Sequence, residues 1–229
     1  MYLKHPQKTF AALLLVCALA FTRYGYAGTL TIDNFTHTQT AIDFGGDDYA
    51  TENTVTILTG TDLTDVSRTL LARTSASDSD VKERIVSGNN LLKISNDADS
   101  AGMASVVWNF DAIDFTRHGN AILLDVAFID LGVNVEMTIN GTASSGVKSI
   151  GGTGNFLVNF GDFTNSSAFG SAHNFSLNFS GPEAWDGRFR ILTAFATPVP
   201  APPAFALMGS ALIGIMGFAR GKSALTSNS

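Results

Sequence analysis

The sequence predicts an all-β fold, and three features support that prediction. Apolar and polar residues alternate with a period of two in segments such as 133–139 and 175–180, as they do in strands that bury one face. Turns rich in Gly, Asn and Ser separate these segments, and almost no proline precedes residue 182. No segment of ordinary helix length has helical periodicity. Short strands at regular spacing are typical of an antiparallel β-sandwich.

The individual strands follow from the same signals. Runs rich in Thr, Val and Ile predict strands at 29–33, 53–59 and 104–110, and residues 85–92 predict a hairpin around a Gly-Asn turn. A last strand is expected near 188–195. Its alternation places Phe189, Ile191, Thr193 and Phe195 on one face and Arg188, Arg190 and Leu192 on the other.

Composition narrows the function classes. The 229 residues suit one domain, and the single Cys17 excludes a disulfide within the chain. The formal net charge is −6, so a classical nucleic-acid binder is not expected, because an acidic surface repels phosphate.

The N-terminus predicts a secretory signal peptide over residues 1–27. Lys4 and Lys8 precede an uncharged apolar run from Phe10 to Phe21, and small residues at Gly25 and Ala27 place cleavage after Ala27. The alternative is an uncleaved anchor. Twelve helical residues at about 1.5 Å each cannot cross a hydrocarbon core of about 30 Å, which favours cleavage.

The C-terminus predicts a proline-rich hinge, a membrane segment and a basic tail. Proline fixes φ and disfavours helix before it, so the motif at 198–203 is expected to be extended. The apolar run 204–219 predicts a transmembrane helix, and the tail 220–229, with Arg220 and Lys222, is expected on the cytoplasmic side. The alternative is a plain single-pass anchor behind a proline linker.

This tail resembles the PEP-CTERM sorting signal of Gram-negative surface proteins. The matching motif is Val199, Pro200, Ala201, Pro202 and Pro203, with Ala201 standing where the family usually has Glu. The resemblance implies processing by an exosortase, a membrane-embedded cysteine transpeptidase, after export through the Sec translocon and cleavage by signal peptidase. It also implies an inner-membrane-anchored precursor that reaches the cell surface or the medium.

The segment 28–197 is expected to form the exported domain. It holds all 20 acidic residues and nine of the basic ones, a net charge of −11. The stretches 32–35, 107–122 and 179–189 resemble the jelly-roll domains of PEP-CTERM proteins, which are similar in fold to carbohydrate-binding modules. The fold class expected is therefore a jelly-roll-like antiparallel β-sandwich.

Candidate ligand sites are few. The resemblance implies a structural calcium near Asp33 and Asp186, and no other cofactor is expected. Acidic clusters at Asp47–Asp48, Asp78 with Asp80, and Asn96–Asp97 with Asp99 offer oxygen ligands, and their alternative role is that of solvated turn carboxylates. Trp185, in a loop, is a candidate for stacking on a sugar, whereas Trp108 lies in an apolar strand and is expected in the core.

No catalytic constellation is evident, so an enzyme is not expected. The three histidines beyond the signal peptide lack metal-ligand spacing, and no Gly-x-Ser-x-Gly elbow precedes a helix. The sequence thus predicts an exported surface or matrix protein, structural or adhesive in a biofilm, that associates with exopolysaccharide. The alternatives are a carbohydrate-binding module for an extracellular polysaccharide and an envelope-bound hydrolase.

Overall fold

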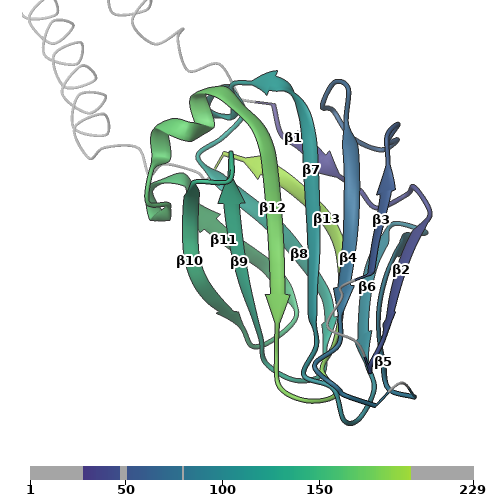
Figure 1. Ribbon diagram of the computed structural model, residues 1–229. Coiled ribbons are helices and arrows are strands. Elements are labelled where there is room, and N and C mark those ends of the chain that lie inside the picture. The colour runs from purple at the N-terminus through teal and green to yellow at the C-terminus, as the bar shows by residue number, and fades with distance from the viewer. Residues whose placement is uncertain (1–27, 47–50, 79, 197–229) are drawn as a thin grey trace, which may run out of the picture. The chain divides into compact units, whose positions relative to one another are not determined.

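Two antiparallel sheets packed face to face form the part of the chain that the structure describes (Figure 1). The computed structural model describes residues 28–46, 51–78 and 80–196. The predicted hinge, membrane segment and tail lie outside these residues, as does the predicted signal peptide. Within the described part the all-β prediction is confirmed.

The first sheet has seven strands in the order β11-β8-β13-β6-β5-β2, and β1 also pairs with β13. Its strands are β1 Leu30–Asp33, β2 Gln39–Phe44, β5 Lys82–Gly88, β6 Leu91–Asn96, β8 Ala121–Ile129, β11 Gly154–Asn159 and β13 Asp186–Phe195. The second sheet has six strands in the order β10-β9-β12-β7-β4-β3. Its strands are β3 Thr51–Val55, β4 Ser67–Arg73, β7 Met103–Ile113, β9 Val133–Ile139, β10 Ala143–Ile150 and β12 Ala172–Ser180.

The last eight strands have the connectivity of a jelly roll. They form two four-stranded halves, β6-β13-β8-β11 and β7-β12-β9-β10, and the chain changes sheet at every connection except β9 to β10. Strands β5 and β2 extend the first half beyond β6, and β4 and β3 extend the second half beyond β7. The jelly-roll expectation is thus met by strand order.

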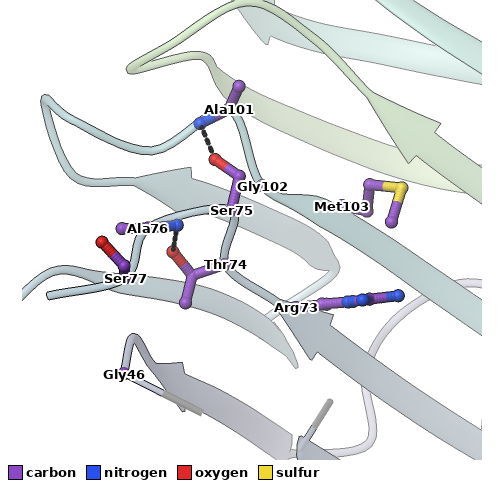
Figure 2. Close-up of a pocket in the computed structure, with 9 residues that line it drawn as sticks. All are labelled: Gly46, Arg73, Thr74, Ser75, Ala76, Ser77, Ala101, Gly102 and Met103. Atoms are coloured by element: carbon purple, nitrogen blue, oxygen red, sulfur yellow. Dashed lines mark hydrogen bonds between the residues drawn. The ribbon is translucent and has the colours of Figure 1, made fainter. Parts of the chain in front are cut away.

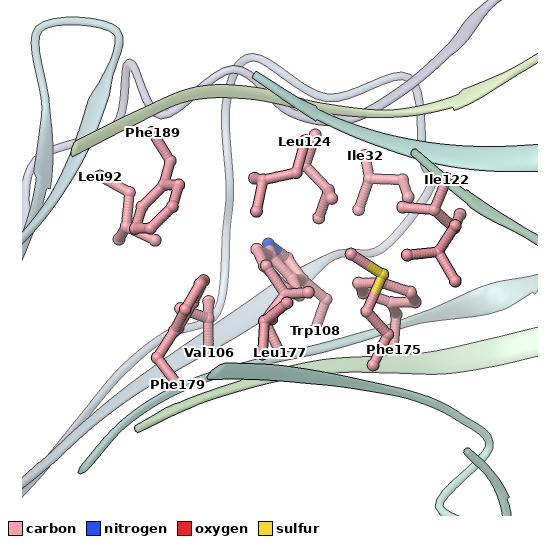
Figure 3. Packing of buried hydrophobic residues seen from close by; sticks show 14 of the residues in the cluster. Ile32, Leu92, Val106, Trp108, Ile122, Leu124, Phe175, Leu177, Phe179 and Phe189 are labelled. Atoms are coloured by element: carbon pink, nitrogen blue, oxygen red, sulfur yellow. The ribbon is translucent and has the colours of Figure 1, made fainter. Parts of the chain in front are cut away.

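A continuous apolar core fills the space between the sheets, and Figure 3 shows its centre. Leu92, Leu124 and Phe189 enter it from the seven-stranded sheet. Trp108 and Phe175 enter it from the other sheet, with ring centroids 5.8 Å apart. Trp108 is fully buried, as its apolar strand predicts.

The predicted hairpin is the β5–β6 pair. Its two-residue turn is Asn89–Asn90, and both residues have positive φ, 55° and 60°. A type I′ turn needs positive φ at both central positions, and asparagine tolerates it better than most residues. The turn lies one residue beyond the expected Gly-Asn pair.

Helical structure is minor in the described part. It consists of three short 3₁₀ helices, η1 Phe115–Arg117, η2 Phe160–Asp162 and η3 Ser166–Ser171. No helix among the described residues is long and apolar enough to cross a membrane.

Two strand predictions need correction. β3 spans Thr51–Val55, so only residues 53–55 of the strand expected at 53–59 belong to it. In β13 the pairing with β8 shifts register between Phe189 and Leu192. Leu192 and Ala194 are therefore fully buried, whereas Ile191, expected in the core, is half-buried. Thr193, expected on the same face as Ile191, is buried. A register shift inserts a residue that simple alternation cannot anticipate.

Candidate functional site

The outer face of the six-stranded sheet carries two cross-strand rows of side chains, which we call row 1 and row 2. Paired positions of β4, β7, β12, β9 and β10 make up each row. Row 1 is Leu71, Ser105, Asn178, Glu136 and Val147. Row 2 is Arg73, Met103, Ser180, Asn134 and Ser149. Neighbouring strands lie about 4.8 Å apart, so each row spans roughly 19 Å.

Hydrogen bonds orient the polar side chains of these rows. The Ser105 hydroxyl donates to the Asn178 amide oxygen at 2.7 Å, and the Ser149 hydroxyl donates to the Asn134 amide oxygen at 2.8 Å. The Ser144 hydroxyl, from the next row, donates to Glu136. Because the amide oxygens are engaged, the two NH₂ groups are turned to act as donors toward a ligand. The rows thus form a preorganised polar surface.

A groove of about 350 Å³ lies over these rows. Its walls combine polar and apolar groups, and Met103 and Val147 are 45% and 67% exposed. Glu136 is the only ionisable side chain among its lining residues, and it is half-buried. The groove can therefore accept hydrogen bonds through one carboxylate, donate them through two amides and cover an apolar surface beside them.

A second cavity, of about 510 Å³, lies at the end of the sandwich and is shown in Figure 2. It is bordered by the segments after β4 and before β7, which are held together by a bond from the Ala101 amide to the Ser75 hydroxyl at 2.8 Å. Met103 lines both the cavity and the groove. The two hollows therefore meet at this side chain.

Beneath this cavity the seven-stranded sheet buries a row of acidic and amide side chains. Asp43, Glu83 and Asn96 are cross-strand partners on β2, β5 and β6, and all three point inward. Asp43 accepts the Thr74 amide at 2.8 Å, but neither carboxylate oxygen of Glu83 nor the amide oxygen of Asn96 has a hydrogen-bond partner. Three acceptor atoms without a donor are expensive to bury.

Protonation of Glu83 resolves this conflict. Burial raises the pKa of Glu83 to about 8, and the nearby Asp43 carboxylate adds to the rise. The backbone N–H groups of Arg73 and Met103 oppose it, although they lie outside normal hydrogen-bond geometry. A neutral Glu83 has one O–H donor, and its cross-strand partner Asn96 has an amide oxygen that lacks a donor. Glu83 is fully buried, so it is not presented to the cavity as a catalytic acid.

Gly102 separates this buried acid from the cavity. A Cβ at residue 102 would lie 1.8 Å from Glu83 Oε2 and 2.5 Å from Asn96 Oδ1. Its backbone has no positive φ, so space, and not conformation, requires glycine there. Sequence reasoning missed Glu83 and Gly102 because neither belongs to a motif. Strand pairing places Glu83 between Asp43 and Asn96, and the packing of the two sheets places Gly102, just before β7, against it.

The predicted calcium ligand Asp33 is occupied by other partners. Its Oδ2 accepts Arg68 Nη1 at 2.6 Å and Trp108 Nε1 at 2.9 Å, and its Oδ1 accepts the Phe35 amide at 2.7 Å. The Arg68 guanidinium also bonds the Gln39 side chain. A cation already lies where a metal ion would need to be, so Asp33 acts as a structural ion-pair partner.

The other candidate, Asp186, lies far from Asp33. Asp33 pairs with Leu192, six residues further along β13, which is roughly 20 Å away at about 3.3 Å per residue. Burial raises the pKa of Asp186, and the carboxylates of Asp130 and Asp97 contribute to the rise. No group of three or more acidic, His or Cys side chains that could hold a metal occurs in the described ranges. Asp47 and Asp48 lie outside them.

Trp185 does not present its ring to a ligand. It is fully buried, and its indole N–H donates to the Gly102 carbonyl at 3.1 Å. Stacking on a sugar needs an open ring face, so the stacking role expected for Trp185 is replaced by a packing role. The sorting motif 199–203 and the flanking Arg220 and Lys222 lie outside the described residues.

Comparisons with known proteins give distant structural neighbours. No protein-family model and no curated protein matches the sequence. A family 11 carbohydrate-binding module from Clostridium thermocellum, solved with a β-1,3-1,4-mixed-linked tetrasaccharide, is 12% identical with a TM-score of 0.36, over 76% of this chain and 100% of that chain. The family 11 module of the cellulosomal cellulase Lic26A-Cel5E of Clostridium thermocellum is 14% identical with a TM-score of 0.36, over 77% and 100%.

A further neighbour is PfGH50B, 6% identical with a TM-score of 0.37. The match covers 56% of this chain but only 22% of the PfGH50B chain. TM-scores below 0.5 indicate only distant similarity.

Proposed function

We propose that the protein binds an uncharged, hydroxyl-rich polysaccharide in the groove over rows 1 and 2. The observation that carries this proposal is the paired arrangement of Ser105 with Asn178 and of Ser149 with Asn134. Fixed amide donors suit sugar hydroxyls, which both donate and accept hydrogen bonds. Side chains that are already oriented lose little conformational entropy on binding.

The shape and polarity of the groove support the same ligand class. Leu71 and Val147 end row 1 on either side of its polar centre, so they can cover the C–H faces of sugar rings. A row of roughly 19 Å gives a chain-like ligand several adjacent contacts. The continuation of the groove to the second cavity at Met103 extends this path. No exposed aromatic side chain lines the groove, so binding rests on hydrogen bonds and aliphatic contact.

Affinity electrophoresis of the full chain through gels that contain neutral glucans, galactans or mannans tests the proposal. Asn178→Ala removes an amide from the groove and is expected to weaken binding at least tenfold. Asn174→Ala is the matched control, because Asn174 lies on the same strand and also bonds a β7 side chain, donating its amide N–H to Asn109, yet lies outside the groove lining. Lack of retardation by every neutral polysaccharide, or equal losses in both variants, would contradict the proposal.

A second proposal concerns the ends of the chain. We propose that the domain is exported behind the signal peptide 1–27 and sorted through the PEP-CTERM-like tail to the cell surface or extracellular matrix, where polysaccharide binding would hold it. The features that support it are the motif at Val199–Pro203, the apolar run 204–219 and the basic Arg220 and Lys222.

Sorting can be tested by the mass of the mature C-terminus in an exosortase-containing host. Pro202→Ala is expected to prevent processing and leave the chain in the inner membrane. Pro182→Ala, which changes an exposed proline before β13, is the control and should be processed normally. Normal processing of the Pro202→Ala chain would refute the sorting role of this motif.

A further inference from the structure

The outer face of the seven-stranded sheet gathers basic side chains in an otherwise acidic domain. Five of the nine basic residues between 28 and 197 lie there, exposed, on β5, β6 and β13. We call this surface the basic face: Lys82, Arg84, Lys93, Arg188 and Arg190. On these strands and β8 only Asp125 and Asp186 contribute outward-facing carboxylates, because Glu83 on β5 is buried in the core. The face is therefore cationic while the segment 28–197 has a net charge of −11.

Most of these cations form no ion pair with a carboxylate, although the Arg188 charge lies close enough to Asp186 to oppose the rise in the pKa of that carboxyl. Arg190 pairs with Asp125 at 3.5 Å, but no ion pair joins Lys82, Arg84, Lys93 or Arg188 to any residue of the described chain. Acidic residues outnumber basic ones more than twofold in the domain, so partners are not scarce. The unpaired cations are a feature of this face.

Lys93 and Arg188 are placed directly opposite each other. They are register partners on β6 and β13, and like charges at such positions repel. Arg84 on β5 pairs with Ser95 on β6, and Ser95 lies two residues from Lys93. Arg84 is therefore a diagonal neighbour of Lys93. Three cations thus converge on one part of the face, and an anion between them would remove the repulsion.

Apolar surface alternates with these charges. Val86 is opposite Lys93, and Ile42 is opposite Arg84. The Arg188 guanidinium lies over the Phe128 ring, 5.1 Å from its centroid, and the side chain stays exposed to solvent. A ligand that fits this face carries spaced anions and an apolar surface between them.

We propose that the basic face binds an anionic polysaccharide whose carboxylates are carried on successive sugars. Arginine binds carboxylate through two parallel N–H donors, and the aliphatic side chains can cover sugar rings between the charges. Duplex DNA fits less well, because its one charge per about 1.7 Å is repelled by the acidic remainder of the domain. This site lies on the opposite sheet from the groove and is independent of the proposed neutral-polysaccharide site.

Retardation of the full chain by polygalacturonate in affinity electrophoresis at 50 mM NaCl tests this assignment. The double variant Lys93→Gln/Arg188→Gln is expected to lose at least tenfold in affinity. Arg117→Gln/Lys148→Gln removes the same charge from other parts of the protein and should bind as the unaltered chain does. Arg188→Lys keeps the charge and should retain part of the affinity.

The outcomes separate the alternatives. No retardation by polygalacturonate, equal losses in both double variants, or tighter binding to duplex DNA than to polygalacturonate would each overturn the proposal. Asn178→Ala should leave polygalacturonate binding unchanged, so failure at the basic face is distinguishable from failure at the groove. Raising NaCl to 500 mM should weaken polygalacturonate binding and leave neutral-polysaccharide binding nearly constant.

Discussion

Asp33 on β1 and Arg68 on β4 form a fully buried salt bridge of 2.6 Å that joins the two sheets. Trp108 on β7 and Gln39 on β2 complete the hydrogen bonding of the pair. A charge pair in a β-sandwich core is tolerable only when each ion is neutralised and hydrogen-bonded. The bridge therefore ties the short β1 strand to the opposite sheet.

Removal of one partner should destabilise the fold strongly. Arg68→Met leaves the Asp33 carboxylate buried beside the Trp108 indole without its cation, and we expect a loss of about 3–5 kcal/mol in the free energy of unfolding. Urea denaturation followed by tryptophan fluorescence measures it. Arg117→Gln breaks the exposed pair with Asp114 and should leave the free energy of unfolding nearly unchanged, because water and salt screen an exposed ion pair. Equal losses would show that the buried pair has no special role.

Glu83 should make stability depend on pH in the direction opposite to that of an ordinary carboxylate. The folded state retains the Glu83 proton up to about pH 8, whereas the unfolded chain releases it near pH 4.5. Between these values the folded state binds more protons, so stability falls as pH rises, by up to about 1.4 kcal/mol per pH unit from this group. Below pH 4.5 and above pH 8 the contribution is flat.

The difference between the unaltered chain and Glu83→Gln isolates this effect from other titrating groups. Glutamine is neutral at every pH and has a similar shape, so its stability should lack this slope between pH 4.5 and 8. Chemical denaturation at half-unit steps measures both curves. Parallel curves would show that Glu83 is ionised in the folded protein.

Gly102→Ala should be destabilising because of Glu83. The added Cβ would lie 1.8 Å from Glu83 Oε2, so the carboxyl must move, and we expect a loss of about 1–3 kcal/mol. In the double variant Glu83→Ala/Gly102→Ala the clash with Oε2 is absent. The double-mutant cycle should therefore give a coupling energy between about 0.5 and 3 kcal/mol. Additive losses would place the strain elsewhere.

Trp185→Phe should affect stability and leave polysaccharide binding unchanged. The substitution keeps a buried ring but removes the N–H that donates to the Gly102 carbonyl, a loss of about 1–3 kcal/mol when that carbonyl is left without a donor. Thermal unfolding and affinity electrophoresis measure the two effects on one sample. Loss of binding at unchanged stability would restore a ligand-stacking role for Trp185.

Much of the fold is readable from local patterns. Alternation over 133–139 and 175–180 predicts β9 and β12, because a strand with one buried face repeats every two residues. The same logic fails in β13, where the register shift near Phe189 turns Leu192 inward. Such a shift depends on the pairing with β8 and is not visible in the sequence of one strand.

The candidate sites were less accessible from sequence. Trp185 and Asp33 stand out as an aromatic ring in a loop and an acid in an opening strand, yet both are buried and engaged by neighbours more than 30 residues away. Asn178, Glu136 and Ser105 are unremarkable strand residues. Their common row follows from the order β7-β12-β9, which sets side by side residues that are far apart in the chain.

The sequence by itself determined the all-β class, the acidity of the central segment and the apolar, basic-flanked ends, because these depend on composition and short-range periodicity. The tertiary structure alone decided which ionisable side chains are buried in the core and which cations lie side by side on one sheet surface. Strand pairing places Glu83 between Asp43 and Asn96, and Lys93 opposite Arg188. The energies of buried and of opposed charges depend on the distances between strands, and those distances exist only once the sheets have formed.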